Sequence, residues 1–414
     1  MRLLPYIDNQ DIILREICES KLKEKYENYI ELQDRLNNEL EIIHMTNIEG
    51  MILCLNKVFT KLHINESQVM TNSFLSNSLV AYLCGITNIN PITFNLNDYF
   101  LHVYDKCRKD FCFNVNSNLG DRIIKELENC EAIYKIVHAK DFFITNSKTI
   151  LCTRPCTYIV IPTINDYDNE DYEDLIHKIE NNDYREIDGY YIVLELIGDN
   201  NLNDLCEISA ITNKDPKYIE MNDVDVLNYF NTEDYNYIFE NLPLYKEDYI
   251  DIANILKPKT FNDLVKLFSI VRGEGVWDNN AEVILKNKII ELDYLPMNRD
   301  ELFDVLTSNY PISKFEAFEM IENLGYGRGI IYPSRFEILI KKGKIQKWFI
   351  DFCNKIKYLI PKQTMIRKAL IMWKLIWYKI HYNDEYNAMY KKNHAHHFKS
   401  CNSQKFILKE VNTK

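Results

Sequence analysis

Cationic and aromatic side chains are concentrated at the C-terminal end of the sequence. From Lys341 to Lys414 the chain carries 17 Lys and Arg against 4 Asp and Glu, a net charge of +13. Since the formal net charge of the whole chain is −12, residues 1–340 carry −25. Lys and Arg side chains bind phosphate backbones by releasing counterions, and aromatic rings stack on bases. The pattern predicts a nucleic-acid contact, although lysines around an ordinary aromatic helix core would give the same composition.

The predicted DNA contact combines this C-terminal region with one earlier arginine, Arg272. The aromatic residues among the cations are Trp348, Trp373, Trp377 and Tyr378. The cations assigned to DNA binding are Arg272, Lys341, Lys342, Lys344, Lys347, Lys355, Lys357, Lys362, Arg367 and Lys368.

No metal site is expected. Cys107 and Cys112 form one Cys-x4-Cys pair without a second pair, which is weak evidence for zinc. The histidines between His394 and His397 fit a solvated basic tail better than a metal site.

The remaining sequence indicates an α+β protein. Residues 10–62 have the apolar spacing of two amphipathic helices, and 73–101 is rich in turn residues around the apolar run 79–83. Residues 157–162 and 189–197 are dense in β-branched and aromatic residues, which predicts strands. Beyond about residue 205 the pattern is helical.

Composition places further limits on the class of protein. The chain has 414 residues and is 46% hydrophobic, enough to bury a sizeable core in two or three units. Without a signal-peptide pattern or an apolar run of membrane-spanning length, we expect a cytoplasmic protein with no membrane partner. Eleven irregularly spaced Cys residues fit reduced thiols.

Four strings resemble, in the same order, passages of the bacterial DNA polymerase III alpha subunit of the PolC type. Residues 78–91 resemble its GS-LVAY-LLGIT-x-I-x-P passage, and 193–199 with 215–219 resemble L-K-L-D-I-L-G-H-D and D-P-K-T-I. Residues 260–281 resemble F-S-D-L-V with H-G-T-D-V-W-x-x-N-A, and 348–362 resemble W-Y-I-D-S-C-x-K-I-K-Y-M-F-P-K-A-H. The resemblance extends over most of the chain.

This resemblance implies the fold and its divisions. The family palm is a polymerase-beta-like nucleotidyltransferase fold, so we expect a degenerate palm remnant with a large all-helical fingers region. The expected units are a helical segment packed on the palm (1–60), a palm-like domain with a reduced thumb remnant near 121–150 (61–205), helical fingers (206–392) and a basic tail (393–414).

The sequence departs from the family at the chemistry that the resemblance implies. The family palm holds two divalent metals with three carboxylates, two in a P-D-I-D motif and one in the L-D-I-L-G strand. Here the corresponding positions are Asp110, Cys112 and Glu195, and a thiol is a ligand that Mg²⁺ avoids. The family's glycine-rich phosphate loop corresponds to residues 69–78, which contain no Gly, Lys or Arg. We therefore expect a pseudo-enzyme without a cofactor, with Mg²⁺ relevant only if residual activity exists.

Three functions fit these observations. The first is a non-catalytic replication protein of a plasmid or phage that binds DNA, recruits host replication factors, or both. The second is a decoy or regulator of the host replicase that acts through protein contacts. The third is a weak residual polymerase using Asp110, Glu195 and Asp199. A weak sliding-clamp peptide is also predicted, with Gln404, Ile407 and Leu408 as its anchors, and the acidic loop 164–188 is a candidate to cover the basic region.

Overall fold

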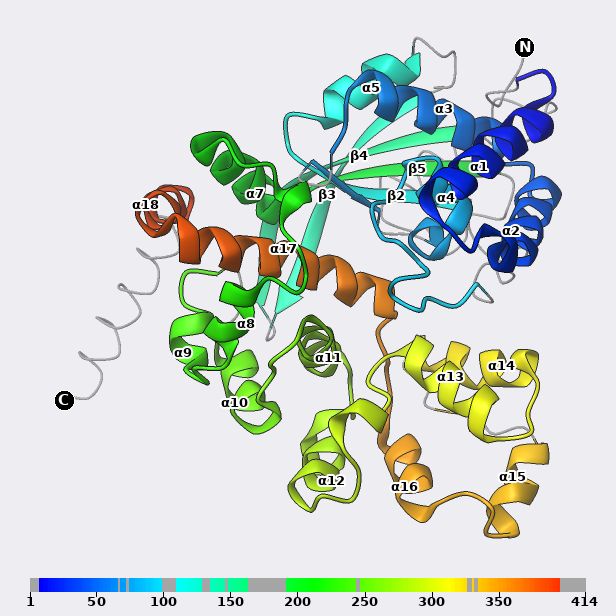
Figure 1. Cartoon of the computed structure of the whole chain (residues 1–414), viewed down its shortest axis with the longest axis vertical. Helices are drawn as coiled ribbons and strands as arrows, with labels where there is room; N and C mark the ends of the chain where they lie inside the picture. Colours follow the sequence, from blue (N-terminus) through cyan, green and yellow to red (C-terminus); the bar gives the residue numbers. More distant parts are fainter. Residues whose placement is uncertain are drawn as a thin grey trace.

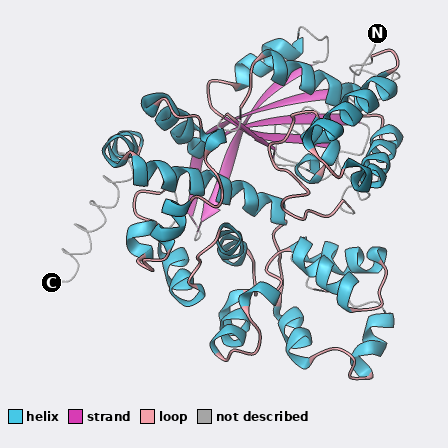
Figure 2. Cartoon of the chain, viewed as in Figure 1, coloured by secondary structure: helices cyan, strands magenta, loops and turns pink. Residues whose placement is uncertain are grey.

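The computed structural model of the chain combines one mixed β-sheet with a predominantly helical remainder (Figure 1, Figure 2). It describes residues 7–65, 68–71, 74–98, 109–128, 135–145, 148–162, 191–242, 246–325, 330 and 334–394. Among these residues no helix is long and apolar enough to cross a membrane. The α+β class expected from the sequence is confirmed.

The N-terminal region contains three α-helices where the sequence pattern predicted two. They are α1 (Gln10–Lys25), α2 (Gln33–Met45) and α3 (Glu49–Lys61), with the short 3-10 helix η1 (Tyr29–Leu32) before α2. The break that was missed lies at Asn47, whose φ of 52° is left-handed. Asn tolerates this conformation better than most residues, so the chain turns between two helices of similar apolar spacing.

Among the residues that the structure describes, the sheet has five strands in the order β1-β2-β5-β4-β3. The strands are β1 (Val69–Thr71), β2 (Lys109–Val115), β3 (Lys135–Thr145), β4 (Lys148–Pro162) and β5 (Tyr191–Gly198). Only the central pair, β2 and β5, is parallel, and the other neighbours are antiparallel. The predicted strands 157–162 and 189–197 therefore lie within β4 and β5.

Two helices accompany the sheet. The apolar run inside the turn-rich passage forms α4 (Leu79–Leu83), which comes after the 3-10 helix η2 (Phe74–Asn77). The helix α5 (Gly120–Glu128) follows β2. The segment expected as a thumb remnant contains α5 and then β3, which pairs with β4. Residues 135–145 and 148–150 of that segment therefore extend the sheet, because their β-branched and aromatic residues suit pairing.

The helical half begins directly after β5. Its α-helices are α7 (Asn200–Thr212), α8 (Val224–Phe230), α9 (Tyr235–Ile238), α10 (Lys246–Leu256), α11 (Phe261–Arg272), α12 (Glu282–Lys286), α13 (Arg299–Asn309), α14 (Lys314–Gly325), α15 (Ser334–Lys341), α16 (Lys347–Lys355), α17 (Lys362–His381) and α18 (Asn383–Asn393). Shorter turns are η5 (Pro216–Tyr218), η6 (Trp277–Ala281) and η7 (Leu292–Tyr294).

Two hydrophobic cores follow this division. One contains residues between Leu14 and Leu196 and lies among the sheet and α1 to α5. The other runs from Leu202 to Met389 and also takes in Met70, Ile89 and Leu96 from the first half.

The long helix α17 links the two halves, and Figure 1 shows it crossing the molecule between the sheet and the lower helices. At its N-terminus the backbone N–H of Lys362 donates to the buried carboxylate of Asp300 at 3.0 Å. The Lys362 ammonium donates to the carbonyl of Phe94 at 2.8 Å. Burial raises the pKa of Asp300, and the hydrogen bond from Lys362 opposes that shift. These contacts fix α17 against both halves.

Candidate functional site

The central strand β2 presents two chemically different faces. Phe111, Phe113 and Val115 point into the core beneath α3 and α5. Successive side chains alternate across a strand, so Cys112 and Asn114 belong to the opposite face. The motif position Cys112 thus shares a face with Asn114, a residue that sequence reasoning did not select. The same alternation, applied to the string 110–114, was the signal that could have found it.

The neighbouring strand β5 brings the third motif position to the same place. In the parallel register Cys112 is opposite Glu195, while Asp110 is opposite Val193 and Asn114 is opposite Ile197. Leu194 and Leu196 of β5 are buried in the core with Phe111 and Phe113, so Glu195 lies on the face of Cys112. Three positions separated by up to 85 residues therefore meet on adjacent strands.

A polar chain of hydrogen bonds crosses the end of this face. The Asn114 amide donates to the Asp199 carboxylate at 2.6 Å, and the Arg367 guanidinium of α17 donates to the Asn114 side-chain oxygen at 3.1 Å. The other oxygen of Asp199 accepts from the backbone N–H of Asn201 at 2.9 Å and caps α7. Both carboxylate oxygens of Asp199 therefore have partners within the protein.

The positive charge at this face comes from Arg367. Burial lowers the pKa of its guanidinium, and the nearby Asp199 and Cys112 oppose that shift. A guanidinium stays protonated through such shifts because its ordinary pKa is above 12. A fixed positive charge consequently lies beside Cys112 and Asn114.

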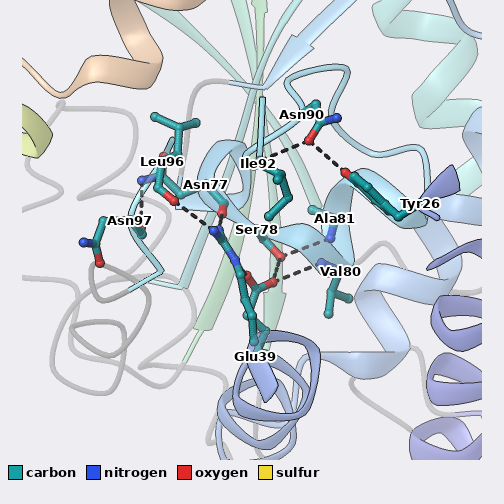
Figure 3. A network of polar contacts seen from close by, with 11 residues as sticks. Tyr26, Glu39, Asn77, Ser78, Val80, Ala81, Asn90, Ile92, Leu96 and Asn97 are labelled. Carbon is teal, nitrogen blue, oxygen red and sulfur yellow. Dashed lines mark hydrogen bonds and ion pairs between the residues drawn. The ribbon is translucent and has the colours of Figure 1, made fainter. Parts of the chain in front are cut away.

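The stretch that corresponds to the family's phosphate loop leads into α4, whose first turn is capped by protein side chains (Figure 3). The Glu39 carboxylate accepts hydrogen bonds from the Ser78 hydroxyl at 2.9 Å and the Val80 backbone N–H at 3.0 Å. The Ser78 hydroxyl in turn accepts from the Ala81 N–H at 3.0 Å. The N–H groups of Val80 and Ala81, two of those that could face an anion at this helix end, are thus already bonded.

The same carboxylate is held by an arginine. Arg35 donates to Glu39 at 2.9 Å and also to the carbonyls of Asn77 and Leu96, at 2.7 and 2.9 Å. Glu39 is almost completely buried, with 1% of its surface exposed. The network fixes α2 against α4 and against the loop that contains Leu96 and precedes β2.

Most of the cations predicted to bind DNA lie at the surface. Gly343, whose φ is 65°, lies in the short turn between α15 and α16 that carries several of them. The exposed ones are Arg272, Lys341, Lys342, Lys344, Lys347, Lys355 and Lys357. We call Lys341, Lys342, Lys344 and Lys347 the basic turn.

Three of the predicted cations are placed differently. Lys362 is buried and bonded to Phe94, so its ammonium is not available to DNA. Arg367 is partly buried at Asn114. Lys368 is also partly buried, donates to the Tyr249 hydroxyl at 2.5 Å and lies 5.0 Å from the ring centre of Phe268. Burial first, and then the charge of Arg272, lower the pKa of Lys368 to about 7.

The aromatic residues also separate into two groups. Trp373 and Tyr378 are fully buried in the helical core, where the Trp373 ring stacks on Phe230. They cannot stack on bases, contrary to the sequence-based interpretation, because helical spacing gave no sign of which face is inward. Trp348 is only partly buried and lines, together with Lys344, a cavity of about 710 Å³ between α11, α13 and α16.

Several sequence predictions fall outside the described residues. These are Cys107, the acidic loop 164–188, the histidines beyond His394, and the clamp-peptide residues Gln404, Ile407 and Leu408. His394 itself is described, and its Nε2 lies 2.8 Å from the Asp204 carboxylate.

Comparison with known proteins agrees with the two-part architecture. Residues 12–142 match the family model for the bacterial DNA polymerase III alpha NTPase domain, and 199–321 match that for the alpha subunit finger domain. The described structure is an α+β fold consistent with a polymerase.

The curated relatives are polymerases named DNA polymerase III PolC-type. The chain is 26% identical to the Clostridium perfringens protein over 219 residues, which covers 50% of this chain and 15% of that protein. It is 26% identical to the Listeria welshimeri protein over 249 residues, with 56% and 17% covered. With the Ureaplasma parvum protein it shares 32% identity over 142 residues, with 34% and 10% covered.

The chain is therefore a DNA-polymerase-related protein that carries a PolC-like core of the bacterial DNA polymerase III alpha subunit. It spans less than a fifth of the length of these curated relatives.

Proposed function

We propose that this chain is a catalytically inactive relative of the replicative polymerase that binds DNA in the replication of a plasmid or phage. In this proposal the mixed sheet is a palm remnant and residues 206–392 are the fingers. The observation that carries it is the sheet face on which Cys112 and Asn114 lie beside the Arg367 guanidinium.

The sheet face that contains Cys112 and Asn114 supports the proposed lack of polymerase activity, for a reason that lies in the chemistry of polymerisation. Two divalent metals must activate the primer hydroxyl and stabilise the leaving pyrophosphate, and carboxylates hold them. Mg²⁺ prefers oxygen ligands, and at Cys112 a thiol stands where the family has a carboxylate. The amide oxygen of Asn114 already accepts from Arg367 at 3.1 Å. The donor set therefore does not fit two Mg²⁺ ions.

The fixed charge adds to this mismatch. A guanidinium near the site repels a divalent cation, since like charges in a partly buried site are weakly screened. The residual-polymerase alternative also needs Asp199, whose two oxygens are occupied by Asn114 and by the cap of α7. The observed contacts thus favour a binding role over a catalytic one.

DNA binding is supported by the distribution of exposed cations. The basic turn places four exposed lysines within seven residues. Lys355 and Lys357 follow at the end of α16, although Lys357 lies 3.3 Å from the Glu274 carboxylate and Lys355 donates to the Asn279 carbonyl at 2.6 Å. Trp348 next to Lys347 adds an aromatic ring for stacking on a base.

The test is a binding isotherm of the full chain on single-stranded and duplex DNA, including fragments of its own replicon, at two salt concentrations. Primer extension with Mg²⁺ and with Mn²⁺ is measured on the same preparations. We expect saturable, salt-dependent binding without extension. Extension that disappears in Asp110→Ala would overturn the claim of inactivity, and absence of binding at both salts would overturn the claim of DNA binding.

The decoy alternative, in which the chain contacts host replication proteins, makes a different prediction. Purified replicase components would then bind the chain equally well after nuclease treatment.

A further inference from the structure

A second surface of the helical half has the features of a protein-binding site. It contains a cavity of about 470 Å³ beside the C-terminal half of α17, lined by Lys214, Asp215, Tyr218, Ile219, Trp377, His381 and Tyr382. We call this cavity the aromatic pocket. Four of its seven lining residues carry rings, and the Trp377 and His381 ring centres are 4.4 Å apart.

Large apolar side chains are exposed around the aromatic pocket. Tyr218 in its wall is 75% exposed, and Val224 at the start of α8 is 67% exposed. Val224 stands between Asp223 and Asp225, which contact Trp377 and His381 of the pocket. Single exposed apolar residues need no explanation, but exposed apolar residues at the rim of a cavity mark a candidate interaction surface.

The charge of this surface argues against DNA. Between Lys214 and Asp225, the segment that lines and flanks the pocket, the sequence has four acidic residues and two lysines, a net of −2. One of the two, Lys217, already lies 3.5 Å from the Asp215 carboxylate. A phosphate backbone would be repelled here, in contrast to the basic turn.

The acidic side chains next to the pocket have defined positions. Asp223 accepts a hydrogen bond from the Trp377 indole N–H at 3.1 Å, which fixes the indole plane. Asp225 lies 3.4 Å from His381 Nε2 and its side chain is 60% exposed. The rings of the pocket are therefore flanked by carboxylates on the side of α8.

Aromatic faces combined with carboxylates favour a cation. Ring faces attract ammonium and guanidinium groups, and nearby negative charge strengthens this attraction. The molecule provides an example at the pocket wall, where the Lys217 ammonium lies 4.6 Å from the centre of the Tyr218 ring.

We propose that the aromatic pocket binds an arginine or lysine side chain from a basic segment of a protein partner. The exposed Val224 beside the pocket would pack against an apolar residue of the same segment. This site uses none of the cations assigned to DNA, and of the aromatic residues predicted to stack on bases it uses Trp377 alone, so either proposal can fail without the other.

The experiment uses the full chain and two pools of labelled nonapeptides at low ionic strength. One pool has a central Arg and the other a central citrulline, which has the shape of Arg without its charge. Both pools have the same randomised flanks. Fluorescence anisotropy should show at least about fivefold tighter binding of the Arg pool. Tyr218→Ala should remove this preference, and Asp225→Asn should reduce it.

Tyr294→Ala is the matched control, because Tyr294 is also an exposed tyrosine, at 68%, but lies in η7 away from the pocket. Equal binding of the two pools, or a preference that survives Tyr218→Ala, would overturn the proposal. So would oligo(dT) binding that is lost in Tyr218→Ala and retained in Tyr294→Ala, since the pocket would then take a base.

Discussion

Neutralising the basic turn is expected to weaken DNA binding in a way that its salt dependence can quantify. In the variant, Lys341, Lys342, Lys344 and Lys347 are replaced by Gln. All four side chains are exposed, so the substitutions leave both hydrophobic cores intact. For duplex DNA each phosphate contact contributes about 0.9 to the slope of log K against log salt, so four contacts contribute about 3.6. Between 50 and 200 mM salt these contacts alone would reduce affinity roughly 150-fold.

The assay is a series of binding isotherms on one duplex at four salt concentrations within this range. The control variant replaces Lys23, Lys57, Lys125 and Lys314 by Gln, which gives the same change of net charge at exposed positions on four other helices. We expect the slope to fall in the first variant and to stay unchanged in the control. A fall of less than about one, or an equal fall in both variants, would refute a localised contact at the basic turn.

Three further predictions concern the interior of the protein. The double variant Cys112→Asp with Asn114→Asp should bind Mn²⁺ saturably, as measured by electron paramagnetic resonance, only when Arg367→Gln is added as a third substitution. Tight Mn²⁺ binding by the double variant, with Arg367 in place, would contradict the proposed repulsion between the guanidinium and the metal ion. The pKa of Lys368 is about 7 in the folded protein, below its ordinary value of 10.5. Between these two pH values the unfolded chain therefore binds more protons than the folded protein, so the contribution of Lys368 to the unfolding free energy rises with pH. Lys368→Met should therefore lessen the gain in unfolding free energy between pH 6 and 9 by roughly 1–2 kcal/mol in urea titrations, whereas an unchanged gain would disagree. Glu39→Gln should lower the unfolding free energy by about 3 kcal/mol, because the Arg35 guanidinium loses its buried counter-charge. The control Glu41→Gln, at an exposed position, should change it almost not at all. Equal effects of the two substitutions would disprove the role of the network.

The local sequence determined the elements and the two-part plan of this protein. The density of β-branched and aromatic residues predicted β5 and the end of β4, and apolar spacing predicted the helical half. These signals arise from neighbouring residues and need no tertiary contact. Where the local signal was ambiguous, as around Asn47, two helices were expected over residues 10–62 and the structure has three.

The candidate site shows what local sequence leaves open. The string around Asp110 and Cys112 identified two positions, and the strand containing Glu195 a third, but only the parallel register of β2 and β5 places Cys112 opposite Glu195. Register depends on pairing across about 80 residues, which no local pattern encodes.

Tertiary structure alone decided which charges are available. Lys362 and Lys344 look alike in the sequence, yet the first is buried against Phe94 and the second is exposed. Likewise Arg367 belongs to a basic stretch, but the path of α17 brings it to Asn114 at the face of the sheet. A helix exposes or buries a residue according to what packs against it, so the sequence specified the charges and the packing of α17 specified their roles.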